Sequence, residues 1–310
     1  MNILITGGAG CLGSNLIEHF LPRGHEILVI DNFATGRPEV VPEVAGLTVI
    51  EGSVVDSDLV DEQFRKFKPT HVINSAAAYK DPSDWLEDAA TNIQGTINVV
   101  NAASRVDIQK FINFQTALCY GRPTSVPIPV NAPTKPFTSY GISKTAGEQY
   151  LAMSDLPFVS LRLANITGPR LAIGPIPTFY SRLKDGKSCF CSDTERDFLD
   201  ISDFLNLIDL IMEEGSSTGI YNVSTGKGNS IKDIFDVVVD HLGVRLEEDV
   251  PIVPVGEDDV KSVILDPKET EQDFGWKAKV DFEDTIRNML KWYDLHGVSA
   301  IYSHLSSSSN

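Results

Sequence analysis

The sequence predicts an α/β fold in which helices cover both faces of a parallel sheet. Through the first half of the chain, short apolar and β-branched runs alternate with segments whose apolar residues recur at helical spacing. The first of these runs, at 2–6, ends in a glycine-rich turn that leads directly into a helical pattern. Strands connected through helices pair in parallel, so this alternation indicates a doubly wound sheet with ligand sites at the carboxyl ends of its strands.

The elements are expected in a simple order along the chain. Strands are predicted at 2–6, 26–30, 47–51, 71–75, 110–115 and 157–162. Helices are predicted directly after the glycine turn and at 56–67, 85–104 and 139–153, with more widely spaced helices at 203–212, 231–241 and 282–293. A proline-rich stretch follows Gly121. Because proline resists both helix and central strand, we expect this stretch to form a stiff wall beside the site.

The turn after the first strand has the residues that a dinucleotide pyrophosphate needs. Glycine at positions 7, 10 and 13 avoids Cβ clashes, lets backbone amides approach an anion and allows the helix to lie close to the strand. Asp31 ends the second strand, where a carboxylate accepts hydrogen bonds from the adenosine ribose diol. A 2′-phosphate would meet like charge there, so Asp31 favours NAD over NADP, although Arg37 softens the repulsion. A turn that only caps strands is the weaker interpretation.

The alternation weakens beyond Gly168, where prolines at 169, 175 and 177 interrupt the chain. We therefore expect a dinucleotide-binding domain of the Rossmann type at 1–168, with later segments near 196–224 returning to it. A smaller, largely C-terminal α/β lobe at 169–310 is expected to bind mainly substrate.

Composition and charge exclude several classes of partner. The chain has 310 residues and a net charge of −17, whereas nucleic acid or an anionic membrane surface would require a basic face. No apolar run approaches the roughly eighteen residues of a membrane span, and the first strand begins at residue 2, so we expect a cytoplasmic protein. The four cysteines are scattered and the histidines dispersed, so we expect free thiols and no metal site.

A tyrosine and a lysine stand one helical turn apart on a predicted helix. Tyr140 and Lys144 share one face of that helix, and a nearby ammonium favours the phenolate of a tyrosine. Thr116, at the carboxyl end of the strand before the proline-rich stretch, offers a hydroxyl that could orient a substrate hydroxyl toward Tyr140. Taken alone, this spacing also describes a packed tyrosine beside a solvated lysine.

The order of these motifs resembles that of the extended short-chain dehydrogenase/reductases. Along nearly its whole length the chain is similar to their nucleotide-sugar epimerase branch, and in particular to UDP-hexose 4-epimerases. The resemblance rests on Thr6 to Gly13, Asp31-Asn32 with Thr35-Gly36, Ala76-Ala77, Asn92 with Gly95-Thr96, Thr116 with Tyr120-Gly121, Tyr140-Gly141-x-Ser143-Lys144, Leu161-Arg162-x-x-Asn165, Gly168-Pro169-Arg170, Arg196-Asp197-Phe198 with Asp203, Tyr221-Asn222-Val223 with Gly226, Asp266 and Gly275-Trp276.

The resemblance implies a role for each matching residue. It makes Tyr140 the general base, Lys144 the residue that holds the nicotinamide ribose and lowers the pKa of Tyr140, and Thr116 the partner of the reacting sugar hydroxyl. NAD would contact Gly7, Gly10, Cys11, Leu12, Gly13, Asp31, Asn32, Thr35, Gly36, Ser53, Val54, Ala76, Ala77, Ala78, Asn92, Tyr140 and Lys144, with Asn92 also supporting the helix around the site. The substrate would contact Lys80, Thr116, Asn165, Arg196 and Val263.

Several of these residues keep a structural alternative. Asn165 could serve only as a cap, and Arg196 only as a surface ion pair with Asp197. Arg162 is expected in an internal ion pair. Arg170 is equally compatible with a ligand contact and a loop anchor, and Asn222 is expected to make a strand-end hydrogen bond.

The chain also departs from the pattern of the family. Ala117 and Leu118 stand where related dehydratases and decarboxylases carry acids, so elimination and decarboxylation are disfavoured. Ser53 replaces an Asp that usually meets the adenine amino group, which weakens that contact. The second phosphate-binding Arg is missing near Val255-Gly256, so the substrate phosphates would depend on Arg196 and other cations, such as Lys80 or Arg182.

The sequence therefore favours an NAD-dependent epimerase of a nucleotide sugar. Its reaction would be inversion at C4 of a UDP-hexose or UDP-N-acetylhexosamine through a transient 4-keto sugar, and Val263 leaves room for either sugar. Alternatives are a reductase, dehydrogenase or dehydratase of the same family and, more remotely, a non-catalytic NAD-binding protein. The family also implies a homodimer formed through helices at 88–104 and 139–153.

Overall fold

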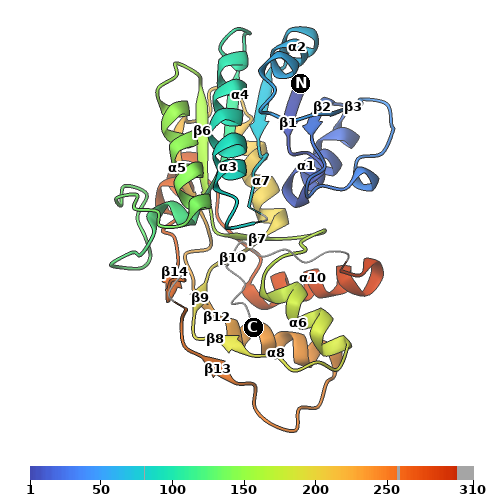
Figure 1. Cartoon of the computed structure of the whole chain (residues 1–310), viewed down its shortest axis with the longest axis vertical. Helices are drawn as coiled ribbons and strands as arrows, with labels where there is room; N and C mark the ends of the chain where they lie inside the picture. The colour runs from blue at the N-terminus through green and yellow to red at the C-terminus, as the bar shows by residue number, and fades with distance from the viewer. Residues whose placement is uncertain (80, 257–258, 299–310) are drawn as a thin grey trace.

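A computed structural model describes residues 1–79, 81–256 and 259–298 (Figure 1). Within this part of the chain, seven parallel strands form one sheet in the order β11-β6-β5-β4-β1-β2-β3. The strands are β1 (Asn2–Thr6), β2 (Glu26–Asp31), β3 (Leu47–Glu51), β4 (His71–Asn74), β5 (Lys110–Thr116), β6 (Phe158–Leu163) and β11 (Gly219–Val223). The predicted doubly wound α/β class is confirmed.

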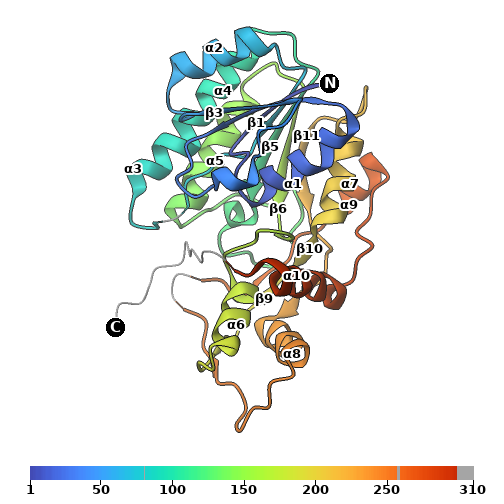
Figure 2. The same cartoon turned by 90° about the vertical axis from the view of Figure 1, so that its right-hand side faces the viewer.

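Helices cover both faces of this sheet, as Figure 2 shows. On one face, α1 (Cys11–Phe20) and α7 (Ile201–Ile211) pack against Ile3 and Ile5 of β1. On the other face, α2 (Ser57–Phe67), α4 (Thr96–Ala103) and α5 (Ser139–Ala152) pack on the side to which Leu4 points. The alternation of Ile3, Leu4 and Ile5 between two cores is the period-two pattern of a strand buried on both faces.

A second core lies below the carboxyl ends of the sheet. The helices α6 (Pro175–Lys184), α8 (Ile231–Leu242) and α10 (Phe282–His296) meet there around Phe179, Phe235 and Tyr293. The helix α6 is not among the helices that the sequence predicts, because Pro175 and Pro177 are typical of an interrupted chain. Both prolines lie in its first turn, where the missing N–H groups would have no intrahelical partner.

Short strands connect the two cores. They are β7 (Asn165–Thr167) with β10 (Phe198–Asp200), β9 (Glu195–Arg196) with β12 (Asn229–Ser230) and β14 (Ser262–Val263), and β8 (Cys191–Ser192) with β13 (Ile252–Val253). After this excursion, α7 and β11 return to the large sheet, where β11 pairs with β6. The domain boundary at residue 168 stays a prediction.

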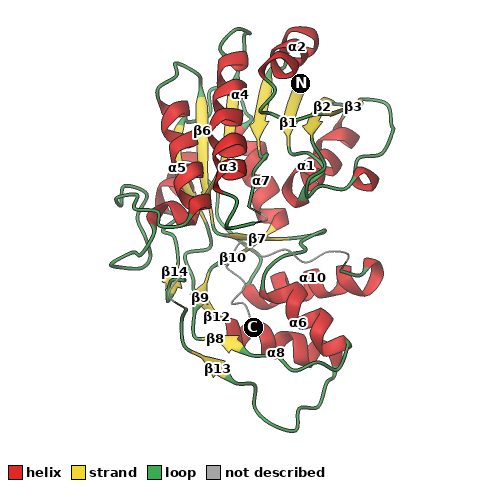
Figure 3. Cartoon of the chain, in the orientation of Figure 1, coloured by secondary structure: helices red, strands yellow, loops and turns green. Residues whose placement is uncertain are grey.

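The expected helix at 85–104 has an irregular centre. It runs as α3 (Trp85–Asp88), a π-helical segment (Ala89–Gly95) and then α4. The other elements are α9 (Lys268–Phe274) and 3₁₀ turns at Leu21–Arg23, Pro38–Val40 and Ala117–Tyr120. The proline-rich stretch after Gly121 is a loop (Figure 3). Within the described ranges, every helix is too short or too polar to span a bilayer.

Candidate active site

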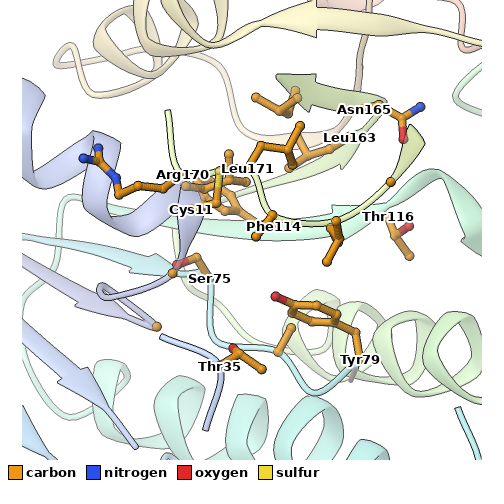
Figure 4. A pocket seen from close by; sticks show the side chains of 18 of the residues that line it. Cys11, Thr35, Ser75, Tyr79, Phe114, Thr116, Leu163, Asn165, Arg170 and Leu171 are labelled. Atoms are coloured by element: carbon orange, nitrogen blue, oxygen red, sulfur yellow. The ribbon is translucent and has the colours of Figure 1, made fainter. Parts of the chain in front are cut away.

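One large cavity, of about 1570 Å³, lies between the carboxyl ends of the parallel sheet and the second core (Figure 4). Every residue predicted for the site lines this cavity, with two exceptions. Asn92 lies behind its wall, and Lys80 falls outside the described residues. The structure therefore brings together, around one space, residues from most of the chain length.

The glycine turn forms one end of the cavity. Gly7 has φ +69°, and a Cβ there would lie 2.8 Å from the backbone of Ala76 after β4. At Gly13 a Cβ would lie 2.4 Å from the carbonyl oxygen of Gly7. The first turn of α1 carries no acidic residue and no side-chain cap. Its backbone amides are therefore available to an anion, which fits the pyrophosphate of a dinucleotide.

Asp31 is oriented by two backbone amides. Its Oδ2 accepts a hydrogen bond from Ala9 N at 2.8 Å, and its Oδ1 accepts one from Phe33 N at 2.8 Å. An ionised carboxylate has about four acceptor sites, so two remain for the hydroxyls of a ribose. These bonds tie the end of β2 to the glycine turn, and the same wall continues through Ser53 and Val54.

Thr116, Tyr140 and Lys144 line the same cavity from two neighbouring elements, β5 and α5. The helix α5 begins beside the end of β5, and Thr138 caps it by accepting a hydrogen bond from Gly141 N at 3.1 Å. Gln115 joins the two elements, because its Nε2 donates to the carbonyl of Lys144 at 2.9 Å and its Oε1 accepts from Thr116 N at 2.8 Å. The hydroxyl of Thr116 accepts from Leu118 N at 3.2 Å and so keeps its own proton for donation.

Burial shifts the pKa of both members of the tyrosine and lysine pair. It raises the pKa of the Tyr140 phenol, and Tyr79 and Asp88 raise it further. Burial lowers the pKa of Lys144 to about 8, with Glu148 opposing the change. Lys144 is not among the groups that shift the pKa of Tyr140 in the protein alone, so its effect on that pKa stays a prediction. Burial strips the phenolate of hydration, so a stable phenolate here requires further positive charge close by.

Asn92 does not line the cavity, but its side chain binds residues that do or that lie next to them. Its side chain donates to the carbonyl of Ala78 at 3.0 Å, accepts from Ala78 N at 2.9 Å and donates to Ser143 Oγ at 3.0 Å. A Cβ at Gly147 would lie 2.5 Å from the carbonyl oxygen of Asn92, so glycine allows α5 to approach. Asn92 thus positions the Ala78 loop and α5, in agreement with its predicted supporting role, while its contact with NAD stays a prediction.

Arg196 lies at the opposite end of the cavity. Its guanidinium forms an ion pair with Asp259 and donates to the carbonyl of Val260 at 2.9 Å, and its side chain is 17% exposed. The alternative pair with Asp197 is wrong, because Asp197 accepts from the backbone of Thr225 and Gly226. Burial lowers the pKa of Arg196, and Asp259 opposes that shift.

The remaining predicted residues have clear positions. Asn165 faces the cavity while its Nδ2 donates to the carbonyl of Asp197 at 3.0 Å, and Val263 pairs in register with Arg196 and belongs to a buried cluster. Arg162 forms the expected internal ion pair, with Glu148 at 2.6 Å. Asn222 accepts from Tyr120 Oη at 2.7 Å.

The lining also includes residues that the sequence analysis did not propose for the site, among them Asp259 and Phe190. Phe190 is 62% exposed, an unusual state for a large aromatic side chain. Neither residue carries a local signal: Asp259 is one of many acids, and Phe190 lies between two cysteines in an otherwise polar stretch.

Comparisons with known proteins identify solved structures of the same fold that contain NAD. The enzyme WbmG of Bordetella bronchiseptica, in complex with NAD, is 70% identical, with 99% of this chain and 98% of that chain covered and a TM-score of 0.94. A structure of WbmG with NAD and UDP is equally similar, at 70% identity, 98% coverage of both chains and a TM-score of 0.95. A putative UDP-glucose 4-epimerase of Methanocaldococcus jannaschii is 28% identical, with 94% and 97% coverage.

A family model described as the NAD dependent epimerase/dehydratase family matches residues 3–224. This range holds the glycine turn, Thr116, Tyr140, Lys144 and Arg196, so the resemblance found in the sequence is confirmed. The chain belongs to the NAD-dependent epimerase/dehydratase family, and its cofactor is NAD.

Proposed function

We propose that the protein inverts C4 of a UDP-linked hexose or N-acetylhexosamine through a transient 4-keto sugar. The observation that carries this proposal is that Thr116, Tyr140 and Lys144 line the cavity between the glycine turn and Arg196. A phenol that could move a proton thus shares one cavity with the glycine turn and with the guanidinium of Arg196.

Each residue has a distinct task in this reaction. Thr116 orients the sugar hydroxyl, Tyr140 accepts its proton, and the Lys144 ammonium stabilises the resulting phenolate. NAD held at the glycine turn and Asp31 would supply the hydride acceptor for the same carbon and the donor for its return. Return to the opposite face requires the sugar to turn, and the small apolar side chains of Ala117 and Val263 on the wall offer it no fixed polar contact.

The residues after Thr116 argue against the other reactions of the family. Ala117 and Leu118 both line the cavity, and neither can move a proton to or from carbon. Elimination and decarboxylation need such a group beside the transient ketone. The chain therefore supports a redox-neutral epimerisation, in which the ketone is reduced again before it leaves.

Charged and aromatic residues at the end of the cavity that holds Arg196 suit a uridine diphosphate. WbmG is described in complex with NAD and UDP. Here Arg196 supplies one cation, and Arg182 of α6, which lines the cavity, supplies a second in place of the Arg missing near Val255-Gly256. The exposed ring of Phe190 offers a face on which a base can stack.

The test is direct incubation of the purified protein with UDP-glucose and, separately, UDP-N-acetylglucosamine. We expect the C4 epimer in the proton NMR spectrum without net NADH absorbance. Stoichiometric NADH formation would instead identify a dehydrogenase and overturn the epimerase proposal. Absence of turnover with both sugars, although NAD and UDP bind, would overturn the proposed substrate class.

We propose further that the protein is a homodimer through α3, α4 and α5. Large apolar side chains are exposed there: Ile142 of α5 is 52% exposed, Met153 directly after α5 is 80% exposed, and Leu86 of α3 is 84% exposed. Exposed apolar clusters mark association sites. Sedimentation should give a dimer mass that Ile142→Asp reduces to the monomer mass, whereas a monomeric wild type would contradict the proposal.

A further inference from the structure

The segment after β7 crosses the first turns of α1 beside the glycine turn (Figure 4). The carbonyl oxygen of Pro169 accepts hydrogen bonds from Asn15 Nδ2 at 3.0 Å and from Cys11 Sγ at 3.4 Å. Leu171 O accepts from Tyr293 Oη of α10 at 2.6 Å. Arg170 is therefore held between the helix that begins at the cofactor turn and the second core.

Arg170 is not fully satisfied in this position. Its two terminal nitrogens donate to the Glu18 carboxylate at 2.8 and 2.7 Å. Its Nε, however, is buried and has no hydrogen-bond partner among the described residues. The backbone of Arg170 also has φ +69°, a left-handed conformation that is costly for a residue with a Cβ and tends to persist at ligand sites.

The Glu18 carboxylate is a partner of Arg170 that another anion can replace. The side chain of Glu18 is 59% exposed and that of Arg170 only 17%, so water competes for the carboxylate while the guanidinium stays close to the protein. Both residues line the cavity. The field of Arg170 reaches the first residue of α1, where it opposes the rise that burial causes in the pKa of Cys11.

We propose that Arg170 changes partner when the cofactor binds, turning its guanidinium from Glu18 to the pyrophosphate at the N-terminus of α1. The inference rests on the proposed dinucleotide site. In a chain with net charge −17, the amides of α1 would then be joined by one mobile cation. Glu18 holds this cation in place in the free protein and competes with the cofactor for it.

If Glu18 and the cofactor compete for Arg170, substitutions of Arg170 and of Glu18 should change the affinity for NAD in opposite directions. The dissociation constant for NAD is measured by calorimetry on nucleotide-free protein. Arg170→Gln should weaken NAD binding about tenfold, as expected for the loss of a charge-assisted hydrogen bond. Glu18→Gln should tighten it several-fold, because the competing carboxylate is gone. Arg105→Gln, which removes an exposed ion pair with Asp61 on α2, is the matched control and should change nothing.

A loop anchor would behave differently, because removing either partner of the ion pair would then weaken NAD binding. Weaker binding by Glu18→Gln, or unchanged binding by Arg170→Gln, would overturn the inference. If Arg170→Gln does not fold, Arg170→Lys keeps the charge without the paired donors and should give an intermediate affinity. A wild-type protein that fails to bind NAD would instead overturn the proposed function. Failure of the Arg170 inference and failure of the proposed function are therefore distinguishable.

Discussion

The two ends of the cavity are built in different ways. At the cofactor end, the lining comes from consecutive loops at the carboxyl ends of β1, β2, β3 and β4. At the substrate end, Arg196, Asp259 and Val263 come together through β9 and β14, strands of two residues each. One end is thus a repeated strand-turn unit, and the other depends on contacts between distant parts of the chain.

Because the two ends are built separately, a substitution at one end should leave ligand binding at the other end unchanged. The cofactor end is fixed by backbone: a Cβ at Gly13 would meet the Gly7 carbonyl oxygen at 2.4 Å. The substrate end is made of side chains on short elements, which tolerate substitution more readily. We therefore expect variants to divide cleanly into those that affect NAD and those that affect the sugar nucleotide, with the catalytic residues between them.

The largest effect is expected at the boundary between the two ends. Tyr140→Phe removes the proton acceptor and should lower kcat for epimerisation by about 10³, within the range typical of general acid–base catalysis. The dissociation constants for NAD and UDP should remain near those of the wild type. Tyr150→Phe, on the same helix but 48% exposed, is the matched control and should retain full activity. Full activity in Tyr140→Phe would end the proposed mechanism.

Loss of a cation at the substrate end should have the next largest effect. Arg196→Gln should weaken UDP binding by about 10- to 100-fold, as expected for a charge-assisted contact, while NAD binding is unchanged. Calorimetry with each nucleotide separately measures both values. The variant also leaves Asp259 without its ion-pair partner, so Arg196→Gln/Asp259→Asn should recover part of the stability but not the affinity. Equal losses for both nucleotides would show that the two ends are not independent.

A smaller effect concerns pH. Burial holds the pKa of Lys144 near 8, so the ammonium is present below that pH and is lost as pH rises through it. We expect kcat to fall several-fold between about pH 7.5 and 9.5. Lys144→Arg keeps its charge throughout, so its rate, although lower, should not fall over this pH range. A kcat profile for each protein tests this, and an unchanged alkaline fall in the variant would exclude Lys144 as its cause.

The contrast between the cofactor end and the substrate end also explains which parts of the site could be predicted from the sequence. The glycine turn, Asp31 and the pair Tyr140 and Lys144 each lie within one strand-turn or one helical turn, so their spacing carries the information. The ion pair of Arg196 with Asp259 depends on pairing between β9 and β14, which two-residue strands do not encode locally. The helix α6 was missed for a related reason, since prolines that begin a helix and prolines that interrupt one look alike in sequence.

The smallest effect is expected from adding one hydrogen bond to NAD at the cofactor end of the cavity. The hydroxyl of Ser53 accepts from Val55 N at 3.2 Å, and a carboxylate at this position can keep that bond with one oxygen while the other accepts from the adenine amino group. Ser53→Asp should therefore tighten NAD binding by about two- to tenfold, the range of one hydrogen bond. Ser53→Ala is the control and should bind NAD slightly more weakly. Because Glu51 and Asp56 lie close in the chain, charge repulsion opposes the gain; if Ser53→Asp binds NAD no better than Ser53→Ala, adenine does not contact this position.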